Sequence, residues 1–398
     1  MIYLAAACLL LLLYSYVGFP LLVSLIATLR PKRWKIDETY RPSVSIILPA
    51  FNEELALRRC LSSLLNLNYP MDKVEILCGS DGSTDRTNAI FHEFAEQHAC
   101  VIPFFFSRQR GKMLTLNDLV EHAKHDILLF VDADVTLNPN ALLSHVRHYA
   151  DSRVGGVAGR LAIASDRSDG VYKSESTFLT IENNLRRSEA QVASTVGLYG
   201  GNYSIRRTLW AQLPNDRVYD DFFAVLTIVT SGKRLLYEEE AVSTELYGRS
   251  YIDEFRRKTR NASRCLYTLT FFPHLLFKGP AAWLLWPHKI FRWVTGFLII
   301  GVMVGSLFAY LGGSRWVFPA LILESILLIM VALGALWKGR QRSIPVISEM
   351  YWFFNMNVAF MIGCFEFLFA KQVPIWSQTT RVADPIHATI VEQEVIHQ

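Results

Sequence analysis

The apolar residues of this 398-residue chain gather near its two ends, and the middle alternates between short apolar runs and polar clusters. Residues 2–29 contain no charged side chain and are long enough to cross a bilayer, which needs about 20 apolar residues. No basic residue precedes this run and no small-residue cleavage site follows it, so we interpret it as a membrane helix and not as a signal peptide. Arg30, Lys32, Arg33 and Lys35 follow directly and, by the positive-inside rule, place the next part of the chain in the cytoplasm.

Between residues 43 and 149, short apolar runs alternate with helical patterns. Buried strands are predicted at residues 44–48, 74–78, 101–106 and 127–131, and helices are predicted to begin near residues 53, 84, 112 and 139. Strands that alternate with helices indicate an α/β fold with a parallel, doubly wound sheet. Each strand is followed by a polar cluster, and ligands bind at the carboxyl ends of the strands in such sheets. We therefore expect these clusters to meet at one edge and form the site.

The pattern is less regular from residue 150 to residue 260. It predicts a strand at 154–163, an amphipathic helix at 172–190, and a tight glycine turn that feeds a strand within 199–207. A helix that opens on two aspartates is predicted at 220–230, where acidic residues suit the helix N-terminus. Residues 251–269 predict a helix with a dense basic face.

The C-terminal part turns apolar again. Residues 268–277 and 281–293 are rich in aromatic and basic residues and contain prolines, which favours helices lying at the membrane surface. Residues 294–311 and 317–337 are predicted to cross the membrane. Residues 346–370 are long enough to cross but carry polar side chains, and we favour a re-entrant or interfacial helix because a full crossing would put the tail outside.

These patterns divide the chain into five parts. We predict an N-terminal transmembrane helix at 1–30, a cytoplasmic domain at 41–265, interfacial helices at 266–293, transmembrane or re-entrant helices at 294–371 and a cytoplasmic tail at 372–398. The protein is then an integral protein of a cell membrane, such as a bacterial inner membrane.

Composition narrows the class of protein. Hydrophobic residues make up 51% of the chain and charged residues 19%, and the net charge of +4 is too small to indicate a nucleic-acid partner. The six cysteines are scattered without a Cys-x-x-Cys pair, so they indicate neither a zinc site nor a disulfide framework and are typical of a reducing compartment.

Asp132 and Asp134 follow directly on the apolar run at 127–131. Unpaired carboxylates are too costly to bury, so these side chains are not expected in the core. Hard oxygen ligands at this spacing suit Mg²⁺ or Mn²⁺ held together with a substrate phosphate. The alternative is an ordinary acidic turn.

Four motifs, in this order, resemble those of the family 2 glycosyltransferases: Pro49-Ala50-Phe51-Asn52-Glu53, Ser80-Asp81-Gly82-Ser83-Thr84-Asp85, Gly111-Lys112 with Leu116-Asn117, and Asp132-Ala133-Asp134. The resemblance covers residues 43–269, and the membrane layout is similar to the branch with hyaluronan, chitin and cellulose synthases and single-sugar membrane transferases. It implies a fold of the GT-A type, a nucleotide-sugar donor such as a UDP-sugar, and Mg²⁺ or Mn²⁺. The implied donor-binding residues are Pro49, Phe51, Asn52, Glu53, Asp81, Lys112, Asp132, Arg257, Trp376 and Arg381; Asp134 and Asp132 would hold the metal, and Gly200, Gly201, Asn202 and Asp220 would lie on the acceptor side.

Asp221 and Arg260 are the predicted catalytic residues. Transfer requires an acceptor hydroxyl to lose its proton as it attacks, which a positioned carboxylate can accept. It also requires stabilisation of the leaving diphosphate, for which an arginine is suited. A single base opposite the leaving group implies inversion at the anomeric carbon. The alternatives are a helix N-cap for Asp221 and attraction to anionic lipid for the basic run at 256–264.

Residues 257–261 stand where processive synthases of the family carry Gln-x-x-Arg-Trp, and only Arg260 is retained. Asn261 replaces the tryptophan that would hold the growing sugar, which favours transfer of one sugar to a lipid-linked or glycan acceptor in polysaccharide or glycolipid synthesis. The alternatives are a processive polysaccharide synthase and a non-catalytic nucleotide-sugar-binding membrane protein. Membrane lipids and a second copy of the chain are further possible partners.

Overall fold

The computed structural model describes residues 1–164, 170–214, 217–246, 250–337 and 344–369. Trp376 and Arg381, predicted to bind the donor, lie outside the described residues. Within these ranges eight strands form one sheet, in the order β3-β2-β1-β4-β7-β6-β8-β5. The strands are β1 (Val44–Ala50), β2 (Val74–Ser80), β3 (Val101–Phe105), β4 (Ile127–Phe130), β5 (Val135–Leu137), β6 (Val154–Ala164), β7 (Tyr203–Arg206) and β8 (Arg234–Leu246).

The expected parallel sheet is confirmed for its first half. Strands β3, β2, β1 and β4 are mutually parallel, and their carboxyl ends meet at one edge. The second half is mixed, because β7 runs antiparallel to both β4 and β6, whereas β8 is parallel to β6 and antiparallel to β5. Strands β5 and β8 were not predicted.

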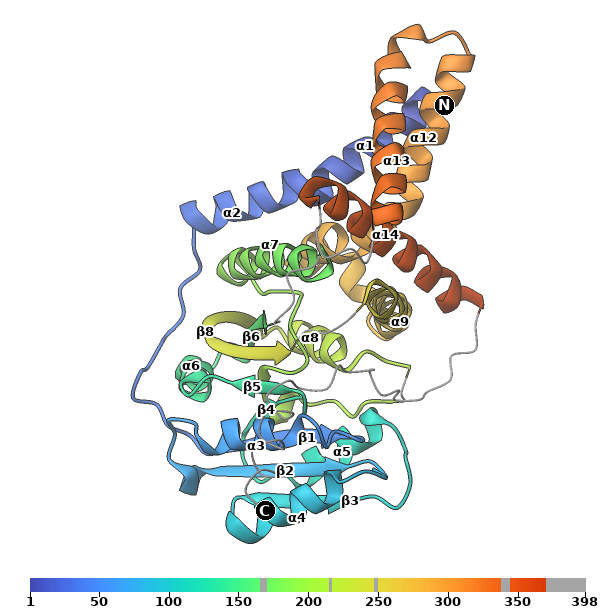
Figure 1. The fold of residues 1–398 in the computed structure, drawn as a ribbon. Coiled ribbons are helices and arrows are strands. Elements are labelled where there is room, and N and C mark those ends of the chain that lie inside the picture. Colours follow the sequence, from blue (N-terminus) through green and yellow to red (C-terminus); the bar gives the residue numbers. More distant parts are fainter. Residues whose placement is uncertain (165–169, 215–216, 247–249, 338–343, 370–398) are drawn as a thin grey trace.

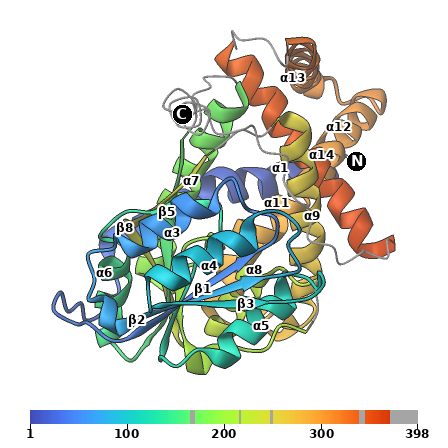
Figure 2. The ribbon, with the colours of Figure 1, turned by 60° about the horizontal axis from the view of Figure 1, so that its bottom comes forward.

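Helices cover both faces of the sheet (Figures 1 and 2). Ile46 of β1 belongs to the core under the helices α3, α4 and α6, and Ile47 belongs to the opposite core under α5 and α8. All seven β1 residues are buried, as expected for a strand with a helix layer on each face. The helices of this domain are α3 (Leu57–Leu65), α4 (Thr87–Gln97), α5 (Lys112–His122), α6 (Ala141–Val146), α7 (Gly170–Val192), α8 (Asp220–Thr230) and α9 (Tyr251–Leu269).

The segment after α9 differs from the prediction of a helix at 268–277. Helix α9 ends at Leu269, and only a short 3₁₀ turn, η5 (Pro273–Leu276), follows, since Pro273 fixes its own backbone and cannot continue the ladder of helical hydrogen bonds. The predicted helix at 281–293 is present, in three pieces: α10 (Gly279–Leu285), a π-helical turn η6 (Trp286–Ile290), and α11 (Phe291–Trp293).

Three helical segments of the described chain are long and apolar enough to cross a membrane: 2–29, 315–337 and 345–369. The first consists of α1 (Ile2–Leu13), a π turn η1 (Tyr14–Gly18) and α2 (Phe19–Leu29). The segment at 279–293 and the helix α12 (Thr295–Leu311) meet at a bend of 68° and qualify only as a pair, a broken span or a re-entrant loop. Helix α12 was predicted as a span by itself. The region predicted to be a re-entrant or interfacial helix is one unbroken helix, α14 (Pro345–Phe369).

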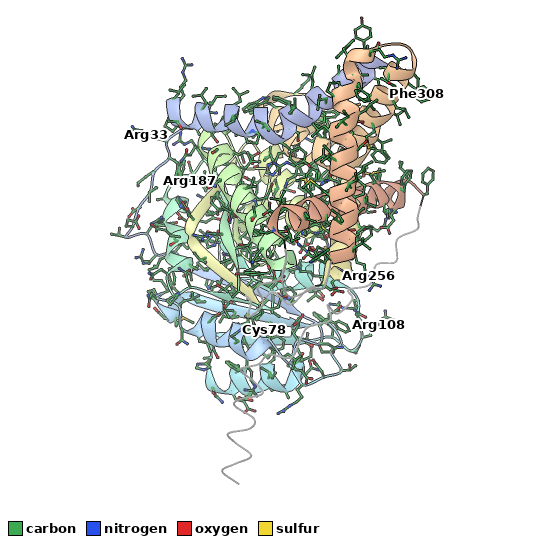
Figure 3. The ribbon with its side chains drawn as sticks, turned by 45° about the horizontal axis from the view of Figure 1, so that its top comes forward. Arg33, Cys78, Arg108, Arg187, Arg256 and Phe308 are labelled. Atoms are coloured by element: carbon green, nitrogen blue, oxygen red, sulfur yellow. The ribbon has the colours of Figure 1, made fainter. Side chains whose placement is uncertain are left out.

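Helices α12 and α13 (Phe318–Trp337) form a hairpin that projects from the α/β domain, and α14 lies between the hairpin and α9 (Figure 1). Figure 3 shows Phe308 near the tip of this hairpin. Arg256 of α9 lies toward the opposite end of the hairpin. Glycines let these helices approach closely: a Cβ atom on Gly363 of α14 would lie 2.6 Å from the Thr259 carbonyl oxygen of α9. The apolar part is thus packed directly on a helix of the α/β domain.

Candidate active site

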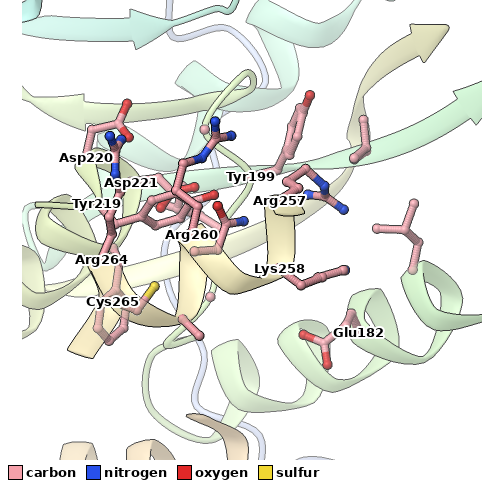
Figure 4. Close-up of a pocket in the computed structure, with 18 of the residues that line it drawn as sticks. Glu182, Tyr199, Tyr219, Asp220, Asp221, Arg257, Lys258, Arg260, Arg264 and Cys265 are labelled. Carbon is pink, nitrogen blue, oxygen red and sulfur yellow. The ribbon is translucent and has the colours of Figure 1, made fainter. Parts of the chain in front are cut away.

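A cavity of about 410 Å³ opens at the carboxyl ends of β1 and β4. Pro49 near the end of β1 and Phe51 directly after this strand line it, and Asp132 and Asp134 line it beyond β4. The cavity continues between α7, α8 and α9 (Figure 4) and reaches the apolar helix α14 at Trp352. Its volume lies within the range of small-molecule sites.

Most of the predicted site residues meet in this cavity. They come from the loops after β1 and β4, the first turns of α5 and α8, the turn before β7, and α9. The predicted residues that line it are Pro49, Phe51, Glu53, Lys112, Asp132, Asp134, Gly200, Asp220, Asp221, Arg257 and Arg260.

Asn52, Asp81, Gly201 and Asn202 are the described predicted residues that do not line the cavity. Asn52 adopts a left-handed backbone (φ 54°), and its side-chain oxygen accepts a hydrogen bond from the Thr84 amide at 2.8 Å. It therefore joins the loops that follow β1 and β2.

Asp81 and Asn202 are fully buried and hold backbone in place. The Asp81 carboxylate accepts hydrogen bonds from the amides of Arg110 (2.9 Å) and Gly111 (2.8 Å). The Asn202 amide donates to the Ala241 carbonyl at 2.8 Å, and its oxygen lies 2.9 Å from Nε2 of His145. These two side chains therefore hold the loops that carry the cavity-lining residues, although they do not line the cavity themselves.

Lys112 links the two sides of the cavity. It begins α5 directly after Gly111, whose φ of 103° lies in a region that glycine adopts easily. The Lys112 ammonium donates to an Asp132 carboxylate oxygen at 2.8 Å and lies 2.9 Å from an Asp220 carboxylate oxygen. Burial alone would lower the pKa of Lys112, but these two carboxylates raise it well above its usual value. The lysine is therefore a fixed positive charge at the carboxyl edge of the sheet.

Asp220 and Asp221 occupy the first turn of α8 and differ in their surroundings. Burial opposes ionisation of Asp220, but Lys112 outweighs it and lowers the pKa of Asp220 below its usual value. Burial and the neighbouring Asp220 charge raise the pKa of Asp221 well above its usual value. The N-cap residue of α8 is Tyr219, so the alternative reading of Asp221 as a helix N-cap is wrong. A buried carboxylate with a raised pKa at the cavity is suited to accept a proton.

The basic residues of α9 have distinct partners. The Arg257 guanidinium pairs with Glu254 at 2.8 Å and with Glu175 at 2.9 Å, and the Lys258 ammonium pairs with Glu175 at 3.3 Å. Arg260 and Arg264 line the cavity from the same helix, near Asp220 and Asp221 (Figure 4). Arg256 does not belong to the described lining of this cavity, so lipid attraction remains open for that residue.

The carboxylates beyond β4 fit a divalent metal. Asp132 and Asp134 supply hard oxygen atoms to the cavity, and Mg²⁺ is commonly held by one or two carboxylates and completed by substrate phosphates. No group of three or more His, Cys, Asp or Glu side chains within the described residues could hold a metal. Two carboxylates fit an ion whose remaining ligands are substrate phosphates and water.

Sequence reasoning missed part of the cavity wall. Glu175, Glu182 and Arg186 follow each other on α7 at spacings of seven and four residues, which puts them on one helix face. In the sequence, these charged positions on one face of an amphipathic helix could have indicated that the helix lines a site. Further lining residues that were not predicted include Tyr16, Glu175, Glu182, Arg186, His288, Lys289, Arg292, Trp352 and Phe360.

Comparisons with known proteins agree with this geometry. Residues 45–212 match the family model described as Glycosyl transferase family 2. The probable glycosyltransferase YdaM of Bacillus subtilis is 26% identical over 62% of this chain and 60% of its own length. A beta-monoglucosyldiacylglycerol synthase of Nostoc is 28% identical over 45% of this chain and 39% of its own length. The chain thus spans less than two thirds of the length of these relatives.

A solved structure has the same fold. The mannosyltransferase PcManGT from Pyrobaculum calidifontis, in complex with GDP-Man and Mn²⁺, is similar over 93% of this chain and 100% of its own, with a TM-score of 0.70 and 22% sequence identity. The mixed sheet with its polar carboxyl edge is the GT-A fold of that structure. The family match, the fold and the residues gathered at the cavity agree, and residues 45–212 are the part of the chain that matches the family 2 glycosyltransferases.

Proposed function

We propose that the protein is a membrane-bound inverting glycosyltransferase that moves one sugar from a nucleotide-sugar to a lipid-linked or glycan acceptor. One observation carries the proposal: a single cavity joins Asp132, Asp134 and Asp221 to Trp352 and Phe360 of the apolar helix α14. A donor bound at the sheet edge and an acceptor anchored in a membrane could meet there.

The donor side lies at the carboxyl ends of β1 and β4. Pro49 and Phe51 would contact the nucleotide base, and Lys112 would be close to its phosphates. Mg²⁺ or Mn²⁺ held by Asp132 and Asp134 would neutralise the negative charge of the leaving diphosphate. Arg260 would stabilise the charge that develops on the same group.

The acceptor side lies around Asp221. Its carboxylate would accept the proton of the attacking hydroxyl, a contribution of roughly 10²–10⁴-fold to the rate. The raised pKa of Asp221 makes it a stronger base than an ordinary aspartate. Attack from the side opposite the diphosphate gives inversion at the anomeric carbon.

The acceptor is proposed to come from the membrane. Aromatic side chains of apolar segments, Tyr16 of η1 and Trp352 of α14, line the far part of the cavity. The Nostoc relative bears the name of an enzyme that makes a glycosylated diacylglycerol. Asn261 also lines the cavity, and its amide offers little apolar surface for stacking a sugar, which favours a single transfer. The basic segment after α2 supports a cytoplasmic catalytic domain.

The test uses the full chain in lipid nanodiscs that contain a bacterial lipid extract. A panel of UDP- and GDP-sugars is supplied with and without a chelator, and nucleoside diphosphate release and product size are measured. We expect release from one donor, dependent on a divalent metal, with one sugar added to a lipid. High-molecular-weight polymer would show a processive synthase, and absence of turnover with every donor while nucleotide still binds would favour a binding protein.

A further inference from the structure

Two cationic side chains in the cavity wall have no ion-pair partner among the described residues. Arg186 lies on α7 and is 8% exposed, and its Nε and Nη1 atoms have no hydrogen-bond partner in the described chain. Lys289 lies on the turn η6 and lines the same cavity. Neither side chain forms a salt bridge with the described carboxylates, whereas the neighbouring Arg187 and Arg292 both do.

The two cations face one point of the wall. A Cβ atom built on Gly197 would lie 3.0 Å from the Lys289 Nζ atom and 3.2 Å from the Arg186 Nε atom. Two positive groups this close repel each other, and the repulsion is stronger in a partly buried site than in water. Gly197 leaves the space beside them free of a side chain.

The nearby carboxylates are engaged elsewhere. Glu182 pairs with Arg292 and lies 3.0 Å from Nε2 of His288. Glu189 lies 2.6 Å from Nδ1 of His288 and accepts hydrogen bonds from the Thr195 hydroxyl (3.0 Å) and the Val196 amide. These acids attract Lys289 from a distance but do not bond to it, so the pair of cations remains available for an anionic ligand.

We propose that Arg186 and Lys289 bind a phosphate group carried by the lipid acceptor. A guanidinium and an ammonium together are a common phosphate-binding combination, because both donate charge-assisted hydrogen bonds to phosphate oxygens. This inference rests on the proposed function and names the acceptor class: a lipid whose head group is a phosphate or diphosphate.

The position of the pair supports the acceptor over the donor. At the proposed donor edge, Lys112 pairs with Asp132 at 2.8 Å, and these two side chains would serve the phosphates and metal of the donor. Lys289 belongs to the segment between α10 and α11 that leads into α12, on the apolar side of the cavity. Burial and Asp220 raise the pKa of Asp221, and the Lys112 and Lys289 ammonium groups act against this rise, so Lys289 is within electrostatic range of the proposed base. A phosphate held there would place the acceptor beside Asp221.

The experiment measures binding without any sugar donor. The full chain in nanodiscs is titrated with farnesyl phosphate, with farnesol and with inorganic phosphate. The variants are Arg186→Gln and Lys289→Met, which remove the positive charge and leave a shorter, unbranched side chain. The control is Arg187→Gln: Arg187 is the next residue of α7, is exposed, and pairs with Glu239 at 3.1 Å. Binding of a nucleoside diphosphate with Mn²⁺ shows that each variant is folded.

We expect the unchanged protein to bind farnesyl phosphate roughly tenfold or more tightly than farnesol. Arg186→Gln and Lys289→Met each remove most of this preference, and Arg187→Gln retains it. Equal binding of farnesyl phosphate and farnesol, or an unchanged preference in both folded variants, overturns the proposal. Inorganic phosphate that binds as tightly as farnesyl phosphate assigns the site to free phosphate and overturns the lipid assignment.

The two proposals can fail separately. Binding of farnesyl phosphate that depends on Arg186, together with no sugar transfer from any donor, leaves the phosphate site standing and removes the proposed function. Sugar transfer to a diacylglycerol by a protein that does not distinguish farnesyl phosphate from farnesol supports the proposed function and overturns the phosphate site.

Discussion

Asp220 and Asp221 are successive residues in the first turn of α8, yet the pKa values of their carboxyl groups are displaced in opposite directions. The difference comes from Lys112, whose ammonium lies 2.9 Å from an Asp220 oxygen and favours the charged form of Asp220. Burial and the negative charge of Asp220 instead disfavour the charged form of Asp221. Opposite displacement in a pair of acids separates their roles. Asp220 is held as an anion by the lysine, and Asp221 is suited to take up a proton.

The first prediction concerns pH. A general base must be deprotonated, so kcat/KM should fall as pH decreases through the raised pKa of Asp221. We expect the acid limb of the profile to lie above about pH 4, where an ordinary aspartate titrates. Donor binding measured over the same range is the control and should change less than kcat/KM. A rate that stays constant down to about pH 4 would contradict the assignment.

The second prediction concerns turnover of Asp221→Asn. The amide keeps the size of the side chain but cannot accept the proton. We expect near-normal donor affinity and a loss of turnover of roughly 10²-fold or more. Initial rates at saturating donor and direct donor binding check this. If donor affinity collapses while saturated turnover survives, Asp221 belongs to the donor site.

The third prediction concerns stability of the same variant. Because the folded pKa of Asp221 is raised above its unfolded value of about 3.9, the folded state holds more protons between the two values, and stability falls as pH rises through that window. Asp221→Asn should therefore raise the Tm at neutral pH, and the gain should vanish below about pH 4.

Asp220→Asn is the matched control for that stability measurement. The folded pKa of Asp220 is lowered, so its contribution is present above its unfolded pKa and is lost as pH falls through the folded pKa. This variant should lower the Tm at neutral pH. Equal changes in the two Tm values would mean that Lys112 does not distinguish the two acids.

The fourth prediction concerns the metal. Asp134→Asn removes one hard ligand from the cavity, and we expect a folded protein with turnover reduced roughly 10²-fold or more and weaker Mn²⁺ binding in the presence of nucleotide. Paramagnetic resonance of Mn²⁺ measures the binding directly. Full activity in excess chelator would exclude a metal-dependent reaction.

The fifth prediction concerns the contact between α14 and α9. A side chain at position 363 meets the Thr259 carbonyl at 2.6 Å, so Gly363→Leu should push α14 away from the helix that carries Arg260. We expect a cost of roughly 1–3 kcal/mol in stability and a clear loss of turnover. Ile362→Leu, a volume-conserving change at a half-exposed neighbouring position, should have little effect. Normal turnover of Gly363→Leu would separate α14 from catalysis.

Helices and strands could be predicted from the sequence where the local pattern of apolar, acidic and basic residues agrees with the element that forms. Helix α8 begins at Asp220, as expected from the two aspartates that open it, and α9 covers the residues 251–269 that were predicted from their basic helical face; the structure adds a capping box between Ser250 and Asp253 at the start of α9. Strand β8 was missed because Glu238, Glu239 and Glu240 interrupt its apolar pattern. Glu238 is buried in the strand with Arg147 (2.8 Å) and His148 (2.6 Å) as partners, which lie in the 3₁₀ turn directly after α6, and such partners cannot be read from spacing.

Site residues that belong to a sequence motif could be predicted. Site residues that reach the cavity only through tertiary packing could not be predicted as well. The loops after β1 and β4 bring Phe51 and Asp132 together because parallel strands end at one edge. Asn202 was expected at the acceptor, but its amide is directed to His145 and Ala241, a choice fixed by packing. Arg186 gave no signal by itself, since its position depends on the approach of α7 to the segment that carries Lys289.

The glycine contacts between α1 and α12 constrain how the chain is made. A Cβ atom on Gly305 would lie 2.8 Å from that of Ala5, and one on Gly301 would lie 2.6 Å from the Cys8 sulfur, so these two helices fit each other closely. Synthesis at about 5–20 residues per second separates them by roughly 15–60 seconds. During that interval α1 is without the helix against which it packs, while the α/β domain emerges from the ribosome. The contact between α1 and α12 therefore forms only after the residues of the α/β domain that separate the two helices have been synthesised.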